Sequence, residues 1–265
     1  ATVQAIARKQ HLVKFPKDFF DYIVIDEAHH AAARTYQALI DYFEPKFLLG
    51  LTATPFRGDE KDVMSCFGDN VFYEMNQEQA IKEGYLADIE YMGFHDNVDY
   101  SDIKWNGSKY DIDDLNRKLM ISERDKSIID KYQIKSNASE KTIGFCTSIE
   151  HADYMSDVFN KAGITSIAIH SKSESSRSRF SSSERDTLLQ RFKDDEFEVA
   201  FTVNMFNEGV DIPDVSTILM LRPTDSLTIF IQQIGRGLRL ANNKKCLKVL
   251  DFIGNYRTAN ITLDG

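Results

Sequence analysis

The feature that most constrains the fold of this chain is the alternation of short apolar runs with helical stretches. Residues 22–25 and 47–52 form two such runs, and a helical pattern over residues 31–42 lies between them. Two apolar runs joined by a helix make a β-α-β unit, in which the strands are parallel. Strands buried on both faces have continuous apolar sequences of this kind. The sequence therefore predicts an α/β protein built on parallel sheets.

A second series of the same kind follows further along the chain. Residues 89–138 are more polar and less regular, so we place a domain junction near residue 88. Residues 1–88 would form part of a first domain, and residues 89–265 a linker region and a second domain. In the second domain we predict strands at residues 142–146, 166–169, 199–203, 217–221 and 247–255, and helices at residues 151–162 and 183–192.

The charge of the chain bears on its partners. A net charge of -9 over 265 residues disfavours nucleic acid, because phosphate binding requires clustered Lys and Arg. The stretch from His170 to Lys193, however, holds six basic residues against three acidic ones, so an acidic protein can still present a basic groove. Within it, residues 171–183 are rich in Ser and Arg, which is typical of a solvated loop, with a specific DNA contact as the alternative.

Cysteine usage and hydropathy narrow the class of protein. Cys66, Cys146 and Cys246 lie far apart and form no C-x-x-C pair, so neither a zinc site nor a disulfide framework is indicated. No stretch approaches 18 consecutive apolar residues. We therefore expect a cytoplasmic protein that has no membrane partner.

Two adjacent carboxylates follow the first predicted strand. Asp26 and Glu27 would lie at the carboxyl edge of the sheet, where ligands of open α/β sheets bind. Such a pair can divide two tasks, since one carboxylate can hold Mg²⁺ while the other polarises the water that attacks a γ-phosphate. The alternative is structural: Asp26 caps the next helix and Glu27 lies in its first turn, near the positive end of the helix dipole.

A pair of arginines near the end of the chain has a regular spacing. If residues 228–240 are helical, Gln232, Arg236 and Arg239 project from one face. Guanidinium groups bind phosphate oxygens and can stabilise the charge that develops in phosphoryl transfer, although an exposed surface helix is the alternative. Gly235 and Gly237 each cost about 1 kcal/mol relative to Ala in a helix, which favours a close backbone approach at these positions.

Four short motifs, in a fixed order, carry a resemblance to a known family. They are residues 24–29 (VIDEAH), 51–55 (LTATP), 207–213 (NEGVDIP) and 232–239 (QQIGRGLR). Together they resemble the superfamily 2 helicases and translocases of the DEAH-box type, over nearly the whole chain. The resemblance implies two RecA-like parallel-sheet domains that use ATP and Mg²⁺ and move along single- or double-stranded DNA, in preference to RNA. The ending at residues 247–255 resembles bacterial helicases related to restriction and repair translocases.

One family motif is missing from these residues. Such proteins bind phosphates with a G-x-x-x-x-G-K-[ST] loop, and the sequence contains no Gly-Lys dipeptide. The first residues, around Thr2, resemble a family motif that contacts the nucleic-acid backbone. We therefore expect a fragment that begins within the first RecA-like domain and hydrolyses ATP poorly by itself.

The resemblance also implies roles for individual residues. Glu27 would be the general base and Asp26 the metal ligand, while Arg239 would be an arginine finger and Arg236 a γ-phosphate contact. Two other functions remain open: a non-catalytic module that binds nucleic acid or a protein partner, and the motor subunit of a restriction nuclease whose nuclease domain lies elsewhere. The remaining implied roles are nucleotide binding for His29, Gly209, Asp211 and Gln232, coupling between domains for Thr52 and Thr54, and nucleic-acid binding for Thr2, Thr147, His170 and Thr202.

Overall fold

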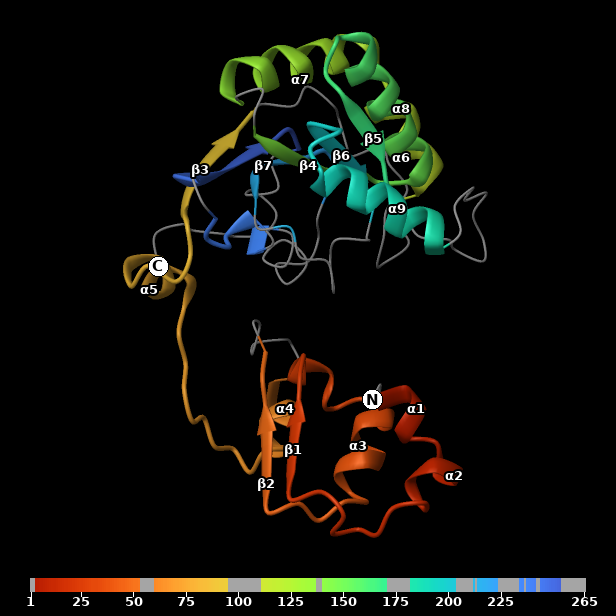
Figure 1. Cartoon of the computed structure of the whole chain (residues 1–265), viewed down its shortest axis with the longest axis vertical. Coiled ribbons are helices and arrows are strands. Elements are labelled where there is room, and N and C mark those ends of the chain that lie inside the picture. The colour runs from red at the N-terminus through yellow and green to blue at the C-terminus, as the bar shows by residue number, and fades with distance from the viewer. Residues whose placement is uncertain are drawn as a thin grey trace. The chain divides into compact units, whose positions relative to one another are not determined.

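The chain divides into two compact units, unit 1 (Ala1–Met75) and unit 2 (Asn76–Gly265). Figure 1 shows unit 1 in red to orange and unit 2 in yellow to blue. The division precedes the junction that the sequence placed near residue 88, because the segment before that residue, with helix α5 (Gln77–Lys82), belongs to unit 2. The computed structural model describes residues 3–52, 60–94, 111–136, 140–170, 182–203, 212, 214–223, 234–235, 237–241 and 244–253.

Unit 1 contains the predicted β-α-β unit. Strands β1 (Tyr22–Ile25) and β2 (Phe47–Gly50) are parallel, with Tyr22 opposite Phe47. The side chains of Leu12, Leu39 and Phe43 form a small apolar core beside them. The other elements of unit 1 are α1 (Val3–Ile6), α2 (Lys9–Leu12), the short 3-10 helix η1 (Ala28–His30), α3 (Arg34–Ile40) and α4 (Glu60–Ser65).

Unit 2 is built on a six-stranded parallel sheet with the strand order β3-β8-β7-β4-β6-β5. Every residue of β4 and β6 is buried, as the continuous apolar runs predicted. The parallel α/β architecture of both units confirms the predicted fold class. The strands are β3 (Asp88–Gly93), β4 (Lys141–Phe145), β5 (Ser166–Ala168), β6 (Val199–Thr202), β7 (Val215–Met220) and β8 (Cys246–Asp251).

Two apolar cores flank this sheet. One contains Ile128 of α7 (Ser122–Lys135) and Phe159 of α8 (Ile149–Lys161). The other contains Phe192 of α9 (Ser182–Lys193) together with Ile234 and Leu238. Among the described residues, none of the helices has the length and apolar character needed to cross a membrane.

Three elements lie in the region that the sequence suggested was irregular. Strand β3 pairs with β8 along its whole length, and α7 is preceded by a further helix, α6 (Ile112–Leu119). The sequence did not locate β3, because it is an edge strand whose polar residues Asp88 and Glu90 interrupt the apolar pattern. Helix α6 begins at a clear cap, since the Asp111 carboxylate accepts a hydrogen bond from the Asp114 backbone N–H at 3.0 Å.

Candidate active site and nucleic-acid contacts

The two carboxylates of unit 1 lie in a tight turn at the end of β1. Glu27 has a left-handed backbone (φ 51°, ψ 48°), and its N–H donates to Asp26 Oδ1 at 2.9 Å. Leu51, which follows β2, accepts a hydrogen bond from the Ala28 N–H at 2.8 Å and so holds the turn against the neighbouring strand. A left-handed backbone is uncommon for a residue other than Gly and is concentrated at functional sites. The capping alternative has no support, because Glu27 occupies the N-cap position of η1 and its side chain makes no capping hydrogen bond.

His29 joins this turn to the end of β2. Its buried Nδ1 lies 3.2 Å from Glu27 Oε2 and 3.1 Å from Thr52 Oγ1. One imidazole nitrogen therefore contacts both the predicted general base and the first threonine of the LTATP motif. This contact joins a residue predicted to bind nucleotide to one predicted to couple the domains, and both roles stay predictions.

Gly50 is a residue of this region that the sequence did not single out. A Cβ atom at Gly50 would lie 2.6 Å from Phe67 Cζ and 2.9 Å from Ala28 Cβ. Only glycine therefore allows β2 to pack this closely against the segment that follows the carboxylates. A glycine in a strand interior is a weak signal of such packing, and nothing in the local sequence indicates Phe67 as the partner.

The carboxyl ends of the unit 2 strands carry a second polar cluster. Thr147 follows β4, and its hydroxyl donates to Asn116 Oδ1 at 3.1 Å. Ser148 donates to the same oxygen at 3.0 Å and caps α8 by accepting from the His151 N–H, also at 3.0 Å. Thr147 was predicted as a nucleic-acid contact, whereas Asn116, Ser148 and His151 were not. Their partners come from α6 and α8, and no local pattern brings them together.

His151 is a buried neutral histidine at this edge. The Thr147 N–H donates to His151 Nδ1 at 3.3 Å, so the ring proton belongs on Nε2. Nε2 is buried and has no hydrogen-bond acceptor within the described part of the chain. Burial, assisted by the positive charge of Arg124, lowers the pKa of His151 to about 3. The ring is thus a neutral donor with an unused N–H.

The other two predicted contacts of this edge are also buried. Thr202 ends β6, and its wholly buried Oγ1 has no hydrogen-bond partner among the residues whose structure is described. His170, after β5, lies with Nε2 3.5 Å from Asp153 Oδ1 on α8. Thr202 lies opposite Phe145, the last residue of the adjacent strand β4, and Thr147 follows two residues later, so both threonines lie at the carboxyl edge of the sheet.

The arginine motif differs from the predicted helix. Ile234, Gly235 and Gly237 are helical, but residues 238–240 are not, so Arg239 lies beyond the helix rather than on its face. The side chain of Arg239 is exposed. A close backbone approach is confirmed at Gly237, where a Cβ atom would lie 2.3 Å from Leu247 Cδ1. At Gly235 a Cβ atom would meet nothing within 4 Å in the described part of the chain, so the close approach predicted there is not seen.

Several predicted site residues lie outside the described part of the chain. The same holds for most of the Ser/Arg-rich segment, residues 171–181. The roles predicted for these residues stay predictions. The residues concerned are Thr2, Thr54, Gly209, Asp211, Gln232 and Arg236.

Comparison with known proteins connects both units to one class of protein. Residues 102–241, more than half of the chain, match the family model described as "Helicase conserved C-terminal domain", and residues 1–57 match "Type III restriction enzyme, res subunit". "Putative ATP-dependent helicase IRC3" of Saccharomyces cerevisiae is 30% identical over 262 residues, which cover 96% of this chain and 37% of the relative. The type I restriction enzyme EcoAI endonuclease subunit of Escherichia coli is 28% identical and covers 89% of this chain, which spans 32% of that subunit.

A solved structure is also similar to this chain and likewise belongs to a restriction-enzyme subunit. It is titled "The fragment structure of a putative HsdR subunit of a type I restriction enzyme from Vibrio vulnificus YJ016" and matches with a TM-score of 0.71 and 28% identity. The match covers 97% of this chain and 48% of that one. The chain therefore spans only about a third to a half of the length of these relatives.

Proposed function

Because this chain belongs to the helicase family defined by that conserved C-terminal domain, we propose that it serves in an ATP-driven motor that moves along DNA. The observation that carries the proposal is the turn after β1, where Glu27 is held in a left-handed backbone beside His29. A carboxylate fixed in this way is suited to polarise the water that attacks the γ-phosphate of ATP. Arg236 and Arg239 of unit 2 would bind the phosphates and stabilise the charge that develops during transfer.

Asp26 is the residue that would hold Mg²⁺. Its exposed carboxylate at a strand end offers the hard oxygen ligand that Mg²⁺ takes, together with water and substrate phosphates. The bound ion would neutralise charge on the phosphates.

The carboxyl edge of the unit 2 sheet would bind the nucleic-acid backbone. Thr147 has a partly exposed hydroxyl, which donates to Asn116 and can still accept a hydrogen bond. Thr202 and His151 are buried at the same edge and carry polar groups that have no partner among the described residues. Groups of this kind contact phosphate and sugar rather than bases, which suits a motor that moves along any sequence. Similarity to restriction-enzyme subunits favours DNA over RNA.

The test is ATP hydrolysis by the natural protein without nucleic acid and with single-stranded DNA, duplex DNA or RNA. We expect one DNA form to stimulate turnover. Glu27→Gln should reduce kcat by roughly 100-fold or more, because general-base catalysis contributes on this scale. Arg239→Ala should reduce kcat by roughly 1000-fold, the lower end for an arginine finger. Unchanged turnover in Glu27→Gln would remove the general-base role, and absence of hydrolysis by a folded protein would favour a non-catalytic binding module.

A second candidate function is the motor subunit of a restriction nuclease. It is favoured by the 28% identity to both the EcoAI endonuclease subunit and the HsdR fragment. ATP-dependent cleavage of duplex DNA by the natural protein with its copurifying subunits would support it, and ATP-driven movement without cleavage would favour a simple translocase. We also propose a cytoplasmic location, because the three cysteines lie far apart in the sequence and indicate no disulfide framework. These 265 residues should hydrolyse ATP poorly by themselves, because they lack a Gly-Lys phosphate loop.

A further inference from the structure

We propose that Lys244 is a positioning residue for Arg239, an inference that rests on the proposed role of Arg239 in ATP hydrolysis. The Lys244 ammonium donates hydrogen bonds to the backbone carbonyl oxygens of Gly237 and of Arg239, at 3.1 Å for the latter. It thus holds the peptide that carries the arginine and the last helical residue before it. Carbonyls at a helix C-terminus lack partners within the helix, and a lysine is a common way to satisfy them.

Leu238, which lies between these two residues, is held by a different part of the chain. The Leu238 carbonyl accepts a hydrogen bond from the Ala87 N–H, immediately before β3, at 2.8 Å. The Leu238 side chain is buried in the apolar core that contains Leu247 and Val249 of β8. Three consecutive carbonyls, at residues 237, 238 and 239, are therefore all bonded. The backbone that carries the Arg239 side chain therefore has little freedom to shift.

Lys244 reaches this segment because the chain turns back before β8. The backbone N–H of Lys244 donates a hydrogen bond to the Ala241 carbonyl at 3.2 Å, and this turn directs the chain back toward residues 237–239. Gly237 lies against Leu247, where any Cβ atom would clash. Leu247 of β8 thus supplies the packing surface, and Lys244, just before β8, supplies the ammonium group that holds the arginine segment in place.

The charge of Lys244 fits this role. Partial burial lowers its pKa to about 8, although negative charge at Asp214 and Cys246 acts in the opposite direction. A lysine that loses solvation here is compensated by its two carbonyl acceptors, and hydrogen bonds from a charged donor are stronger than neutral ones. Lys245, the next residue, is exposed and offers a natural comparison.

The test compares Lys244→Met with Lys245→Met in the natural protein, each alone and combined with Arg239→Ala. Methionine keeps the aliphatic stem and removes the donors. We expect Lys244→Met to lower kcat for DNA-stimulated ATP hydrolysis by roughly 10- to 100-fold with less than roughly threefold change in KM for ATP, the scale of a misplaced catalytic group. Lys245→Met should leave both constants unchanged. In the Arg239→Ala background, Lys244→Met should cause no further loss of kcat.

The outcomes separate this inference from the proposed function. If Arg239→Ala lowers kcat but Lys244→Met does not, or if the two losses multiply, the positioning role is overturned while the function stands. If no nucleic acid stimulates hydrolysis, or Arg239→Ala has no effect, the proposed function itself fails. Should Lys244→Met not fold, Lys244→Gln takes its place: it removes the charge and shortens the side chain, and an unchanged kcat in that variant would also overturn the inference.

Discussion

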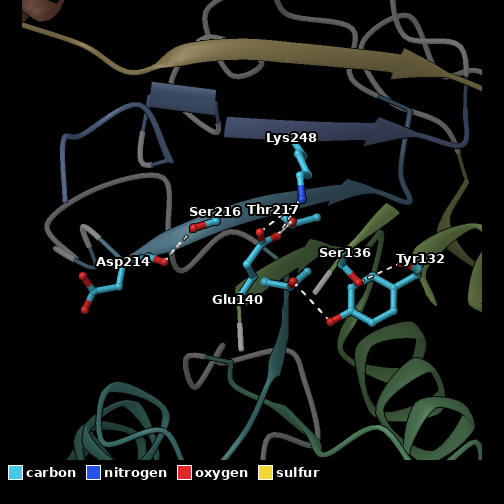
Figure 2. A network of polar contacts seen from close by, with 8 residues as sticks. Tyr132, Ser136, Glu140, Asp214, Ser216, Thr217 and Lys248 are labelled. Carbon is cyan, nitrogen blue, oxygen red and sulfur yellow. Dashed lines mark hydrogen bonds and ion pairs between the residues drawn. The ribbon is translucent and has the colours of Figure 1, made fainter. Parts of the chain in front are cut away.

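The polar side chains at the amino ends and at the carboxyl ends of the unit 2 strands differ in how fully they are hydrogen-bonded. At the amino edge, where the strands begin, the Glu140 carboxylate lies 3.0 and 3.1 Å from Lys248 Nζ on β8, and Thr217 on β7 donates to it at 3.5 Å (Figure 2). Nearby, the Tyr132 and Thr142 hydroxyls lie 3.4 Å apart. Charged and hydroxyl groups at this edge are thus paired with one another across three strands and a helix.

At the carboxyl edge the pairing is incomplete. His151 Nε2 and Thr202 Oγ1 are buried, and in the described part of the molecule neither has a hydrogen-bond partner. Leaving a buried polar group unsatisfied costs about 1–3 kcal/mol. Folded proteins rarely retain such groups without a reason, and ligands of parallel α/β sheets bind at the carboxyl edge. The amino edge thus uses its polar groups to hold the fold, and a ligand for Thr202 and His151 at the carboxyl edge stays a proposal.

The largest expected effect concerns the ion pair of the amino edge. Glu140→Ala should lower the free energy of unfolding by about 3 kcal/mol, because it leaves the mostly buried Lys248 ammonium without its carboxylate. Glu196→Ala is the control. Glu196 pairs with Arg191 at the surface, so its replacement should lower the free energy of unfolding by less than about 1 kcal/mol. Denaturant titration measures both variants. Equal, small losses would show that the amino edge does not depend on its ion pair.

A double replacement sharpens this prediction. Glu140→Leu combined with Lys248→Met removes both charges, and we expect it to recover most of the loss, because a buried pair replaced by apolar side chains is often nearly neutral. A double variant as unstable as Glu140→Ala would mean that the surrounding hydrogen bonds, and not the unpaired charge, account for the loss.

The next effect concerns His151 and acid stability. Its pKa is about 3 in the folded protein against an ordinary value of 6.5, so between these values the unfolded chain binds a proton that the folded protein does not. This contribution to stability is therefore present above pH 6.5 and is lost as the pH falls, by about 2 kcal/mol between pH 7 and pH 5. His151→Gln should remove that part of the pH dependence of unfolding. Identical profiles for the natural protein and His151→Gln would contradict a buried neutral ring at this edge.

The parts of the molecule that the sequence predicted share one property, which is a local signal. Apolar runs located β4 and β6, and two carboxylates directly after such a run located the turn at Asp26 and Glu27. The left-handed backbone of Glu27 has no such signal, because the tertiary contact of Ala28 with Leu51 closes the turn. The positions of Asp26 and Glu27 at a strand end follow from the residue pattern, whereas the roles proposed for them follow from the family resemblance.

The parts that escaped prediction depend on contacts between distant residues. Asn116 accepts hydrogen bonds from both Thr147 and Ser148, and a single Asn in a polar stretch gives no sign of them. The helix predicted over residues 228–240 does not include residues 238–240, because the carbonyls there bond to Lys244 and Ala87 instead of continuing the helix. A lysine in the sequence is by default a surface residue, so the capping role of Lys244 could not be inferred.

The smallest expected effect is the most direct comparison of the two edges. Thr142 and Thr202 are both fully buried and lie on the adjacent strands β4 and β6, toward opposite ends. Thr142→Val should lower the free energy of unfolding by about 1 kcal/mol, because the hydroxyl contact with Tyr132 is lost. Thr202→Val should leave it unchanged or raise it by about 1 kcal/mol, because an unsatisfied hydroxyl is removed.

DNA binding by the same two variants should show the reverse order. Thr202→Val should weaken equilibrium binding, measured by fluorescence anisotropy at fixed salt concentration, while Thr142→Val should bind as the natural protein does. A hydroxyl whose removal stabilises the fold and weakens DNA binding is kept for the ligand. If Thr202→Val instead destabilises the protein as much as Thr142→Val and binds DNA normally, the Thr202 hydroxyl serves the fold, and the contrast between the edges would then depend on His151 alone.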